Sequence, residues 1–215
     1  MKSILSALFF TTALAAAGDS VSLFDGKSLA GWKTPDGKAP GSGWSIQGET
    51  LHLNGTPGGM LLSEKTYTNF DFEWEWKVEE GGNNGVKYWV TKVGGKEWLG
   101  IEYQMIDDHK HPDGLKGGSH TTASIYDIKE PAADKPLKPV GEWNSSRVIV
   151  KDGVIQHWLN GVLVCEADTK SDDWKTRIAA SKFKSKVGFA PGSGHLMLTD
   201  HTDKVWYRNL RVKEL

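Results

Sequence analysis

Seven acidic, amide and imidazole side chains crowd into one short stretch, residues 101–114, which read IEYQMIDDHKHPDG. Carboxylates and imidazoles so close together could bind a divalent metal ion, exchange protons with a substrate, or simply lie in a hydrated loop. Strict alternation over 101–107 predicts a β-strand with Glu102 and Gln104 on one face. The opposite, apolar face is assigned to the core.

The polar face of this strand has the chemistry of a sugar site if the preceding strand, 85–91, belongs to the same sheet. Lys87 and Trp89 would then share the face of Glu102 and Gln104. An indole ring can stack on the apolar side of a sugar, while carboxylate, amide and ammonium groups bond to its hydroxyls. The alternative interpretation is an ordinary solvated sheet face.

Three reactions compete for these residues. A metal site is the first, since Asp107, His109, His111 and Asp113 offer carboxylate and imidazole ligands at i, i+2 spacing. Retaining glycoside hydrolysis, as in laminarinase-type glucanases, is the second, and it needs two carboxyl groups about 5–5.5 Å apart. Asp107 lies five residues after Glu102, so the two face opposite sides unless a bulge intervenes. The third is proton abstraction beside a carbonyl, which needs one base, an acid and a group that holds the enolate.

The elements that must position these groups are short alternating runs separated by Gly and Asn turns. They predict an all-β fold of two packed antiparallel sheets, a β-sandwich. We expect the clearest run, FDFEWEWKV at 70–78, to form a hairpin with 85–91. Asp152-Gly153 and Asn160-Gly161 predict two tight hairpins within 146–167. Further elements are predicted as strands at 98–107, 186–190, 195–199 and 205–212, a short helix at 171–183 and a surface loop at 127–140.

The composition supports a self-sufficient core in a single domain. The 215 residues include ten Trp, seven Phe and five Tyr, and Cys165 is the single cysteine, so no internal disulfide can form. Alternation predicts that Trp74, Trp76 and Trp158 are buried. A formal net charge of −1 with no basic block excludes nucleic acid as the expected partner.

The N-terminus is typical of a cleavable export signal. Lys2 precedes an apolar run that ends in Ala15-Ala16-Ala17. We therefore expect residues 1–17 to be removed and 18–215 to form one secreted or periplasmic domain. The apolar run is too short for a stable span, so no membrane insertion of the mature chain is expected.

The chain resembles the 3-keto-disaccharide hydrolase family over almost the whole mature sequence. The resemblance is carried by LFDGKSLAGW (23–32), EYQMIDDHKHPD, TTASIYDI (121–128), HWLNGV (157–162) and the terminal WYRNLRVKEL. It implies a concanavalin A-like jelly roll with a ligand groove on the concave face of one sheet. It also implies cleavage of small oxidised sugars, in which a ketone at carbon 3 acidifies the hydrogen on carbon 2. A base removes that hydrogen, the oxygen on carbon 1 leaves, and water adds later.

The resemblance also implies a set of site residues. His111 is the first choice for the base, and Glu102 is the alternative base or the group that orients it. Lys87 or Arg208 would stabilise the enolate oxygen, and Tyr126 would protonate the departing oxygen. The expected substrate-binding residues are Gln104, Asp107, Trp89, Asn84, His201 and Arg208.

Several points stay open at this stage. A divalent ion held by Glu102 and His111 is an alternative to the cationic side chain, and the sequence does not decide between them. Arg208 alternates in step with Leu210 and Val212 and is therefore expected on the core-facing side of its strand. A guanidinium buried there would need a carboxylate partner. Ser124 stands where many relatives carry Gly. The runner-up function is a non-catalytic carbohydrate-binding module, and all versions require Glu102 and His111 to converge on one solvent-filled hollow.

Overall fold

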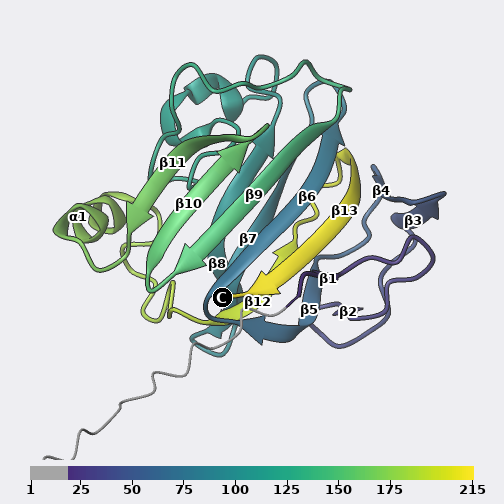
Figure 1. The fold of residues 1–215 in the computed structure, drawn as a ribbon, viewed down its shortest axis with the longest axis horizontal. Helices are drawn as coiled ribbons and strands as arrows, with labels where there is room; N and C mark the ends of the chain where they lie inside the picture. The colour runs from purple at the N-terminus through teal and green to yellow at the C-terminus, as the bar shows by residue number, and fades with distance from the viewer. Residues whose placement is uncertain (1–18) are drawn as a thin grey trace, which may run out of the picture.

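The computed structural model describes residues 19–215, and the predicted export signal at 1–17 lies outside this range. The described chain forms two antiparallel sheets packed face to face, as Figure 1 shows. The predicted all-β sandwich is therefore confirmed. No helix in this part of the chain is long and apolar enough to cross a membrane.

The larger sheet, here called sheet A, has eight strands. Its outer face is turned toward the viewer in Figure 1. In spatial order the strands are β11 (Val162–Asp168), β10 (Val154–Leu159), β9 (Asn144–Lys151), β6 (Phe70–Val78), β13 (Lys204–Glu214), β4 (Thr50–Asn54) and β3 (Trp44–Gln47), with β1 (Val21–Ser22) paired to β13.

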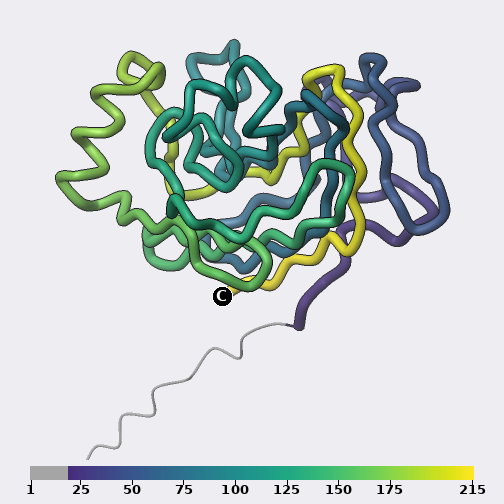
Figure 2. The backbone as a smooth tube through the Cα atoms, turned by 90° about the horizontal axis from the view of Figure 1, so that it is seen from above, coloured from purple at the N-terminus to yellow at the C-terminus, as the bar shows by residue number. Residues whose placement is uncertain are grey.

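The smaller sheet, sheet B, has five strands and lies behind sheet A in Figure 1. Helix α1 (Asp172–Ala180) lies at one side of the two layers and the segment with β3 and β4 at the other, as Figures 1 and 2 show. The strands of sheet B in spatial order are β2 (Trp32–Lys33), β5 (Leu61–Tyr67), β12 (Gly194–Leu198), β7 (Asn83–Val93) and β8 (Glu97–Ile106).

The core fills the space between the sheets and follows the predicted alternation. Phe70, Phe72, Trp74 and Trp76 on β6 are almost fully buried. They face the apolar residues of β8, whose Ile101, Tyr103 and Met105 are also inaccessible. Burial of aromatic side chains supplies the largest stabilising area per residue, so these two strands anchor the sheets to each other.

Two tight turns form as predicted. Asp152 and Gly153 have φ of 53° and 91°, and Asn160 and Gly161 have φ of 47° and 83°. Positive φ at both central residues is the geometry that matches the twist of flanking strands. The helix also forms: Ser171 accepts a bond from the Trp174 amide at its start, and Trp174 is buried.

Three elements differ from the prediction. The strands at 70–78 and 85–91 do not form a hairpin, because β6 belongs to sheet A and β7 to sheet B, so the loop EEGGNN crosses between layers. Residues 186–190 form turns rather than a strand. Trp158 is half-buried instead of buried, because its position on β10 faces away from the partner sheet, while the neighbouring His157 and Leu159 face inward.

Candidate functional site

Strands β7 and β8 place an acid and a base directly opposite each other on the outer face of sheet B. Lys87 pairs in register with Glu102, and Lys87 Nζ lies 3.5 Å from Glu102 Oε2. Their side chains are only 15% and 6% exposed. A mostly buried ion pair of this kind interacts more strongly than one in bulk water. The predicted sharing of this face by Lys87, Glu102 and Gln104 is thus what the structure shows.

Glycine at position 85 makes room for the Glu102 carboxylate. A Cβ atom built on Gly85 would lie 2.3 Å from Glu102 Oε1, closer than any real contact. The carboxylate therefore lies over the backbone of β7, and no hydrogen bond to it occurs among residues 19–215. Glu102 is left with its ammonium neighbour and free lone pairs, which is the state a base requires. The sequence analysis did not identify Gly85.

The segment after β8 folds back along the same edge and brings Tyr126 beside Glu102. The amide of Ala123 donates to Gln104 O at 2.8 Å, and the amide of Tyr126 donates to Glu102 O at 3.0 Å. The Gln104 side chain donates to Asn83 Oδ1 at 3.3 Å and is nearly inaccessible. Buried His157 holds this segment from the core side by a hydrogen bond, because its Nδ1 lies 3.1 Å from Ala123 O.

Tyr126 is held by a carboxylate that the sequence analysis had considered only as a metal ligand. Its hydroxyl donates to Asp113 Oδ2 at 2.6 Å. Burial, together with this hydrogen bond, raises the pKa of Tyr126 above its ordinary value. For Asp113, burial acts to raise the pKa, but hydrogen bonds from Lys116, Tyr126 and His120 prevail and hold it at about 2. Tyr126 therefore stays protonated with its hydrogen directed at Asp113.

His120 and Lys182 lie beside Tyr126 and Asp113, and neither residue was predicted as part of the site from the sequence. His120 Nδ1 lies 3.2 Å from Asp113 and its Nε2 lies 3.5 Å from Asp127. Lys182 Nζ lies 4.1 Å from the centre of the Tyr126 ring, because the amide of Lys182 donates to Asp127 after helix α1 ends. Burial of this ammonium lowers the pKa of Lys182, while the charge of Glu102 opposes the change. We call Lys87, Glu102, Gln104, Tyr126 and Lys182 the Glu102 cluster.

His111 lies near this cluster but is not arranged as a base. Its Nδ1 accepts the amide hydrogen of Asp113 at 3.0 Å. A backbone amide can only donate, so neutral His111 carries its proton on Nε2 and has no free lone pair. His111 connects to Glu102 only through Asp113 and Tyr126, and neither Glu102 nor His111 lines the two cavities described here. Neither of these cavities brings the two together, and their convergence on one hollow stays a prediction.

Two predicted binding residues point into the sandwich. Asn84 Oδ1 accepts bonds from the Tyr207 hydroxyl at 2.5 Å and from Thr199 at 3.1 Å, and Asn84 is fully buried. Trp89 is 2% exposed, because a bulge between Tyr88 and Thr91 gives it a φ of 50° and turns it inward. A bulge inserts one extra residue and so reverses the parity that alternation assumes.

Two further candidates make no contact with Glu102 among residues 19–215. Arg208 belongs to sheet A, where its guanidinium lies 2.6 Å from Glu75 on the outer face. A bulge between Arg208 and Arg211, with Asn209 at φ 55°, takes Arg208 out of the parity of Leu210. His201 is exposed in the turn after β12, and no contact connects it to Glu102 within residues 19–215.

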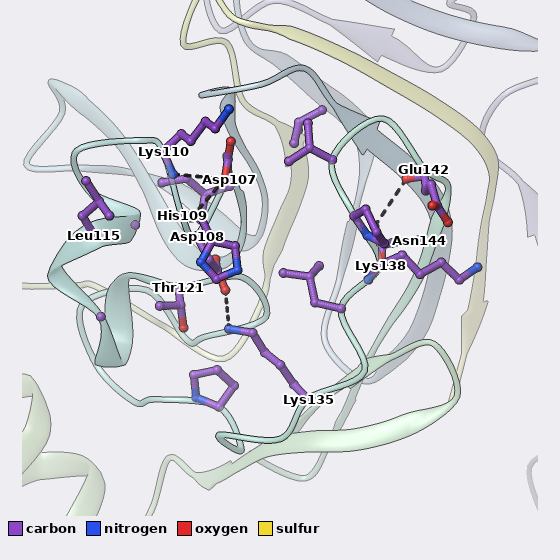
Figure 3. Close-up of a pocket in the computed structure, with 18 of the residues that line it drawn as sticks. Asp107, Asp108, His109, Lys110, Leu115, Thr121, Lys135, Lys138, Glu142 and Asn144 are labelled. Carbon is purple, nitrogen blue, oxygen red and sulfur yellow. Dashed lines mark hydrogen bonds and ion pairs between the residues drawn. The ribbon is translucent and has the colours of Figure 1, made fainter.

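Asp107 lines a cavity of about 950 Å³ at the end of the sandwich, shown in Figure 3. Its walls are the loop after β8, with Asp108 and His109, and the loop before β9, with Lys135 and Lys138. The Asp107 carboxylate accepts amide bonds from Gly81, His109 and Lys110. Asp108 pairs with Lys135 at 2.7 Å. Both carboxylates therefore hold the loop in shape rather than stand free for catalysis.

The predicted metal sites do not fit the structure. No group of three or more His, Cys, Asp or Glu side chains in residues 19–215 is placed to hold a metal ion. The potential ligands already have partners: Asp107 binds three amides, Asp113 binds Tyr126 and Lys116, and His111 accepts from an amide. No step of the mechanism below uses a metal.

Comparison with known proteins identifies the family. The model of the 3-keto-alpha-glucoside-1,2-lyase-like domain matches residues 19–213. A 3-keto-disaccharide hydrolase from Bacteroides thetaiotaomicron is 32% identical over 227 aligned residues, which cover 91% of this chain and 78% of the relative. The chain belongs to this family, as its motifs predicted, and so to the glycoside-cleaving enzymes.

Solved structures agree with the fold. A candidate glycosyl hydrolase from Parabacteroides distasonis has a TM-score of 0.81 at 32% identity, covering 91% of this chain and 94% of its own. A second protein of that organism has a TM-score of 0.70 at 24% identity, covering 92% and 100%. A Bacillus subtilis protein with a galectin-like fold reaches 0.51 at 12% identity, covering 85% and 89%, which supports the fold alone.

Proposed function

From this membership and the Glu102 cluster we propose that the chain cleaves 3-keto-glycosides by elimination. The observation that carries the proposal is the 3.5 Å separation of Glu102 Oε2 and Lys87 Nζ on a sheltered sheet face. Carbons 2 and 3 of a 3-keto sugar are bonded neighbours, so a base for the hydrogen on one and a cation for the oxygen on the other must also be adjacent. Glu102 and Lys87 meet that requirement.

The reaction begins at carbon 2 of the sugar. Glu102 removes the proton, the electron pair of the C2–H bond forms a double bond between carbons 2 and 3, and the π pair of the ketone moves to its oxygen to give an enolate. The ammonium of Lys87 stabilises the charge that develops there, which is the role of a preorganised electrostatic group. Gly85 supports this step, because its missing side chain leaves the carboxylate in place.

The second step breaks the glycosidic bond. The enolate re-forms the ketone, a double bond forms between carbons 1 and 2, and the oxygen on carbon 1 departs. Lys182 supplies the proton to that oxygen, because an ammonium with a lowered pKa is a better donor than the Tyr126 hydroxyl, whose pKa is raised. Water then adds across the double bond, with hydroxide at carbon 1 and a proton at carbon 2, so the net change is hydrolysis.

Retaining hydrolysis of ordinary sugars has less support. It needs a second free carboxyl group about 5–5.5 Å from the first. Asp107, the candidate from the sequence, is bonded to three backbone amides and lines the 950 Å³ cavity, which Glu102 does not line. Export is also part of the proposal: it rests on the composition of residues 1–17 and places the sugar outside the cytoplasm.

The test is to incubate the purified protein in D₂O with 3-keto-trehalose, 3-keto-sucrose and the two unoxidised parents, with and without a chelator. We expect cleavage of the keto sugars alone, deuterium at carbon 2 of the released 3-keto sugar, and no effect of the chelator. Cleavage of the unoxidised parents, or a product without deuterium, would contradict elimination. Binding of the keto sugars without cleavage would favour a non-catalytic carbohydrate-binding module.

A further inference from the structure

A second hollow, of about 470 Å³, lies on the outer face of sheet A, on the other layer from the Glu102 cluster. It crosses four neighbouring strands, β10, β9, β6 and β13, so it extends over three strand spacings, about 14 Å. The outward-facing residues that line it are Trp158, Ser145, Arg147, Glu73, Glu75, Asn209 and Arg211.

Trp158 is the aromatic wall of this hollow and differs from two other half-buried tryptophans. Trp143 has Arg208 at 4.1 Å and Lys77 at 5.3 Å from its ring centre. Trp206 has Lys77 at 4.9 Å and stacks on His52 at 4.6 Å. In residues 19–215 no cation or second ring covers Trp158. Its partly exposed indole therefore borders the hollow with no other side chain stacked on its ring.

Three of the four charged side chains that line the hollow are paired, and Arg211 has no ion pair among residues 19–215. Glu75 accepts from Arg208 at 2.6 Å and from Asn209 at 2.9 Å. Arg147 makes two bonds to Asp71, at 2.7 and 2.5 Å. A charged ligand would have to compete with the three paired groups, whereas a neutral molecule with many hydroxyls can bond to their remaining donors and acceptors and to the Arg211 guanidinium.

The backbone holds this arrangement in place at a cost. Asn209 has a φ of 55°, a left-handed conformation that asparagine tolerates better than most residues. The bulge there turns both Arg208 and Asn209 toward Glu75. Local backbone strain is retained where the surrounding structure requires it, which fits a surface shaped for a ligand.

We propose that this hollow binds an uncharged sugar unit of a glycan, with the sugar ring stacked on Trp158 and its hydroxyls bonded to Asn209, Ser145 and the paired charges. An aromatic wall beside a few polar groups is the arrangement that binds such ligands. The site lies on a different sheet from Lys87 and Glu102, so it binds without cleaving. It holds the protein on a glycan whether or not the Glu102 cluster performs the proposed reaction.

The test is native gel electrophoresis in gels that contain dextran, glycogen, laminarin or hydroxyethyl cellulose. The parent protein is the Glu102→Gln variant, so that the Glu102 cluster cannot process the glycan. We expect at least one glycan to retard this protein, and Trp158→Ala to weaken the retardation about two- to tenfold, the range expected for the loss of one aromatic contact. Trp158→Leu, which keeps an apolar side chain without a flat ring, should behave like Trp158→Ala.

Trp143→Ala is the matched control, because cations already cover its ring, and it should leave the retardation unchanged. Trp158→Phe should retain most of it. In the Glu102-containing protein, Trp158→Ala should leave turnover of 3-keto-trehalose unchanged, which also confirms that the variant folds. Absence of retardation by all four glycans, or equal retardation of the parent and both Trp158→Ala and Trp158→Leu, would overturn the proposal.

Discussion

The outer faces of the two sheets each carry an acid directly opposite a base. On sheet B, Glu102 pairs in register with Lys87; on sheet A, Glu75 pairs in register with Arg208. The sheet B pair is 3.5 Å apart, with side chains 6% and 15% exposed. The sheet A pair is 2.6 Å apart, with side chains 30% and 39% exposed.

The two carboxylates differ in whether their oxygens remain free to accept a proton. Both oxygens of Glu75 accept hydrogen bonds, one from Arg208 and one from Asn209. Burial acts to raise the pKa of Glu75, but these bonds and the guanidinium charge prevail and lower it, which makes Glu75 a weak base. Glu102 has one ammonium neighbour and no hydrogen bond in residues 19–215. A similar cross-strand pair is thus a structural clamp on one sheet and a candidate catalytic pair on the other.

Removing each acid in turn is the strongest test of this comparison. Glu102→Gln should lower kcat for 3-keto-trehalose by about 100- to 10,000-fold, the usual contribution of a general base. Glu75→Gln, the matched control on sheet A, should leave kcat close to wild type, because its carboxylate bonds to Arg208 and Asn209 on that sheet and to no residue of the Glu102 cluster within residues 19–215. Steady-state kinetics together with the melting temperature check both. Equal losses in the two variants would show that neither pair is specific to catalysis.

Lys182→Arg separates charge from proton transfer at the sheet B site. Arginine keeps the positive charge but does not release a proton at accessible pH. We expect kcat to fall about 100-fold for the disaccharide, the low end of general acid catalysis. A 3-keto glycoside of 4-nitrophenol, whose leaving oxygen needs no proton, should be cleaved at the wild-type rate.

The pH profile gives a second measurement on Lys182. An acid must be protonated, so activity falls as pH rises through its pKa. Because burial lowers the pKa of Lys182, the alkaline limb of wild-type kcat/KM should lie below the ordinary lysine value of 10.5, and Lys182→Arg should remove it. An unchanged limb in the variant would assign the proton donor elsewhere.

Gly85→Ala tests whether the position of the Glu102 carboxylate matters, and it is the variant for which we expect the smallest loss of activity. The new Cβ would meet Glu102 Oε1 at 2.3 Å, so the carboxylate must move while it remains in the protein. A displacement of about 1 Å can cost up to about 100-fold in rate, and we expect a loss below that of Glu102→Gln. Kinetics with circular dichroism as the folding check measure it. Wild-type activity in this variant would show that the position of the carboxylate is unimportant.

Alternation alone predicted much of this molecule correctly. It placed Glu102, Gln104 and Lys87 on one face and Tyr103 on the other, because side chains on a regular strand alternate without exception. It was wrong at Trp89 and Arg208, where a bulge adds one residue and reverses the parity. It also wrongly joined 70–78 to 85–91 in one sheet. The sequence of a loop does not determine whether the strand after it pairs with the strand before it or crosses to the other sheet.

The sequence by itself determined the two-sheet architecture, the hairpin turns at Asp152 and Asn160, the family, and the acid–base pair on neighbouring strands. All of these follow from local periodicity, turn chemistry or short motifs. Only the tertiary structure decided which acid is free, because that depends on partners distant in the chain. Asp113 and Asp127 meet His120, Lys182 reaches Tyr126 from beyond helix α1, and Gly85 lies under Glu102. Those contacts are set by packing between segments, which no spacing in the sequence encodes.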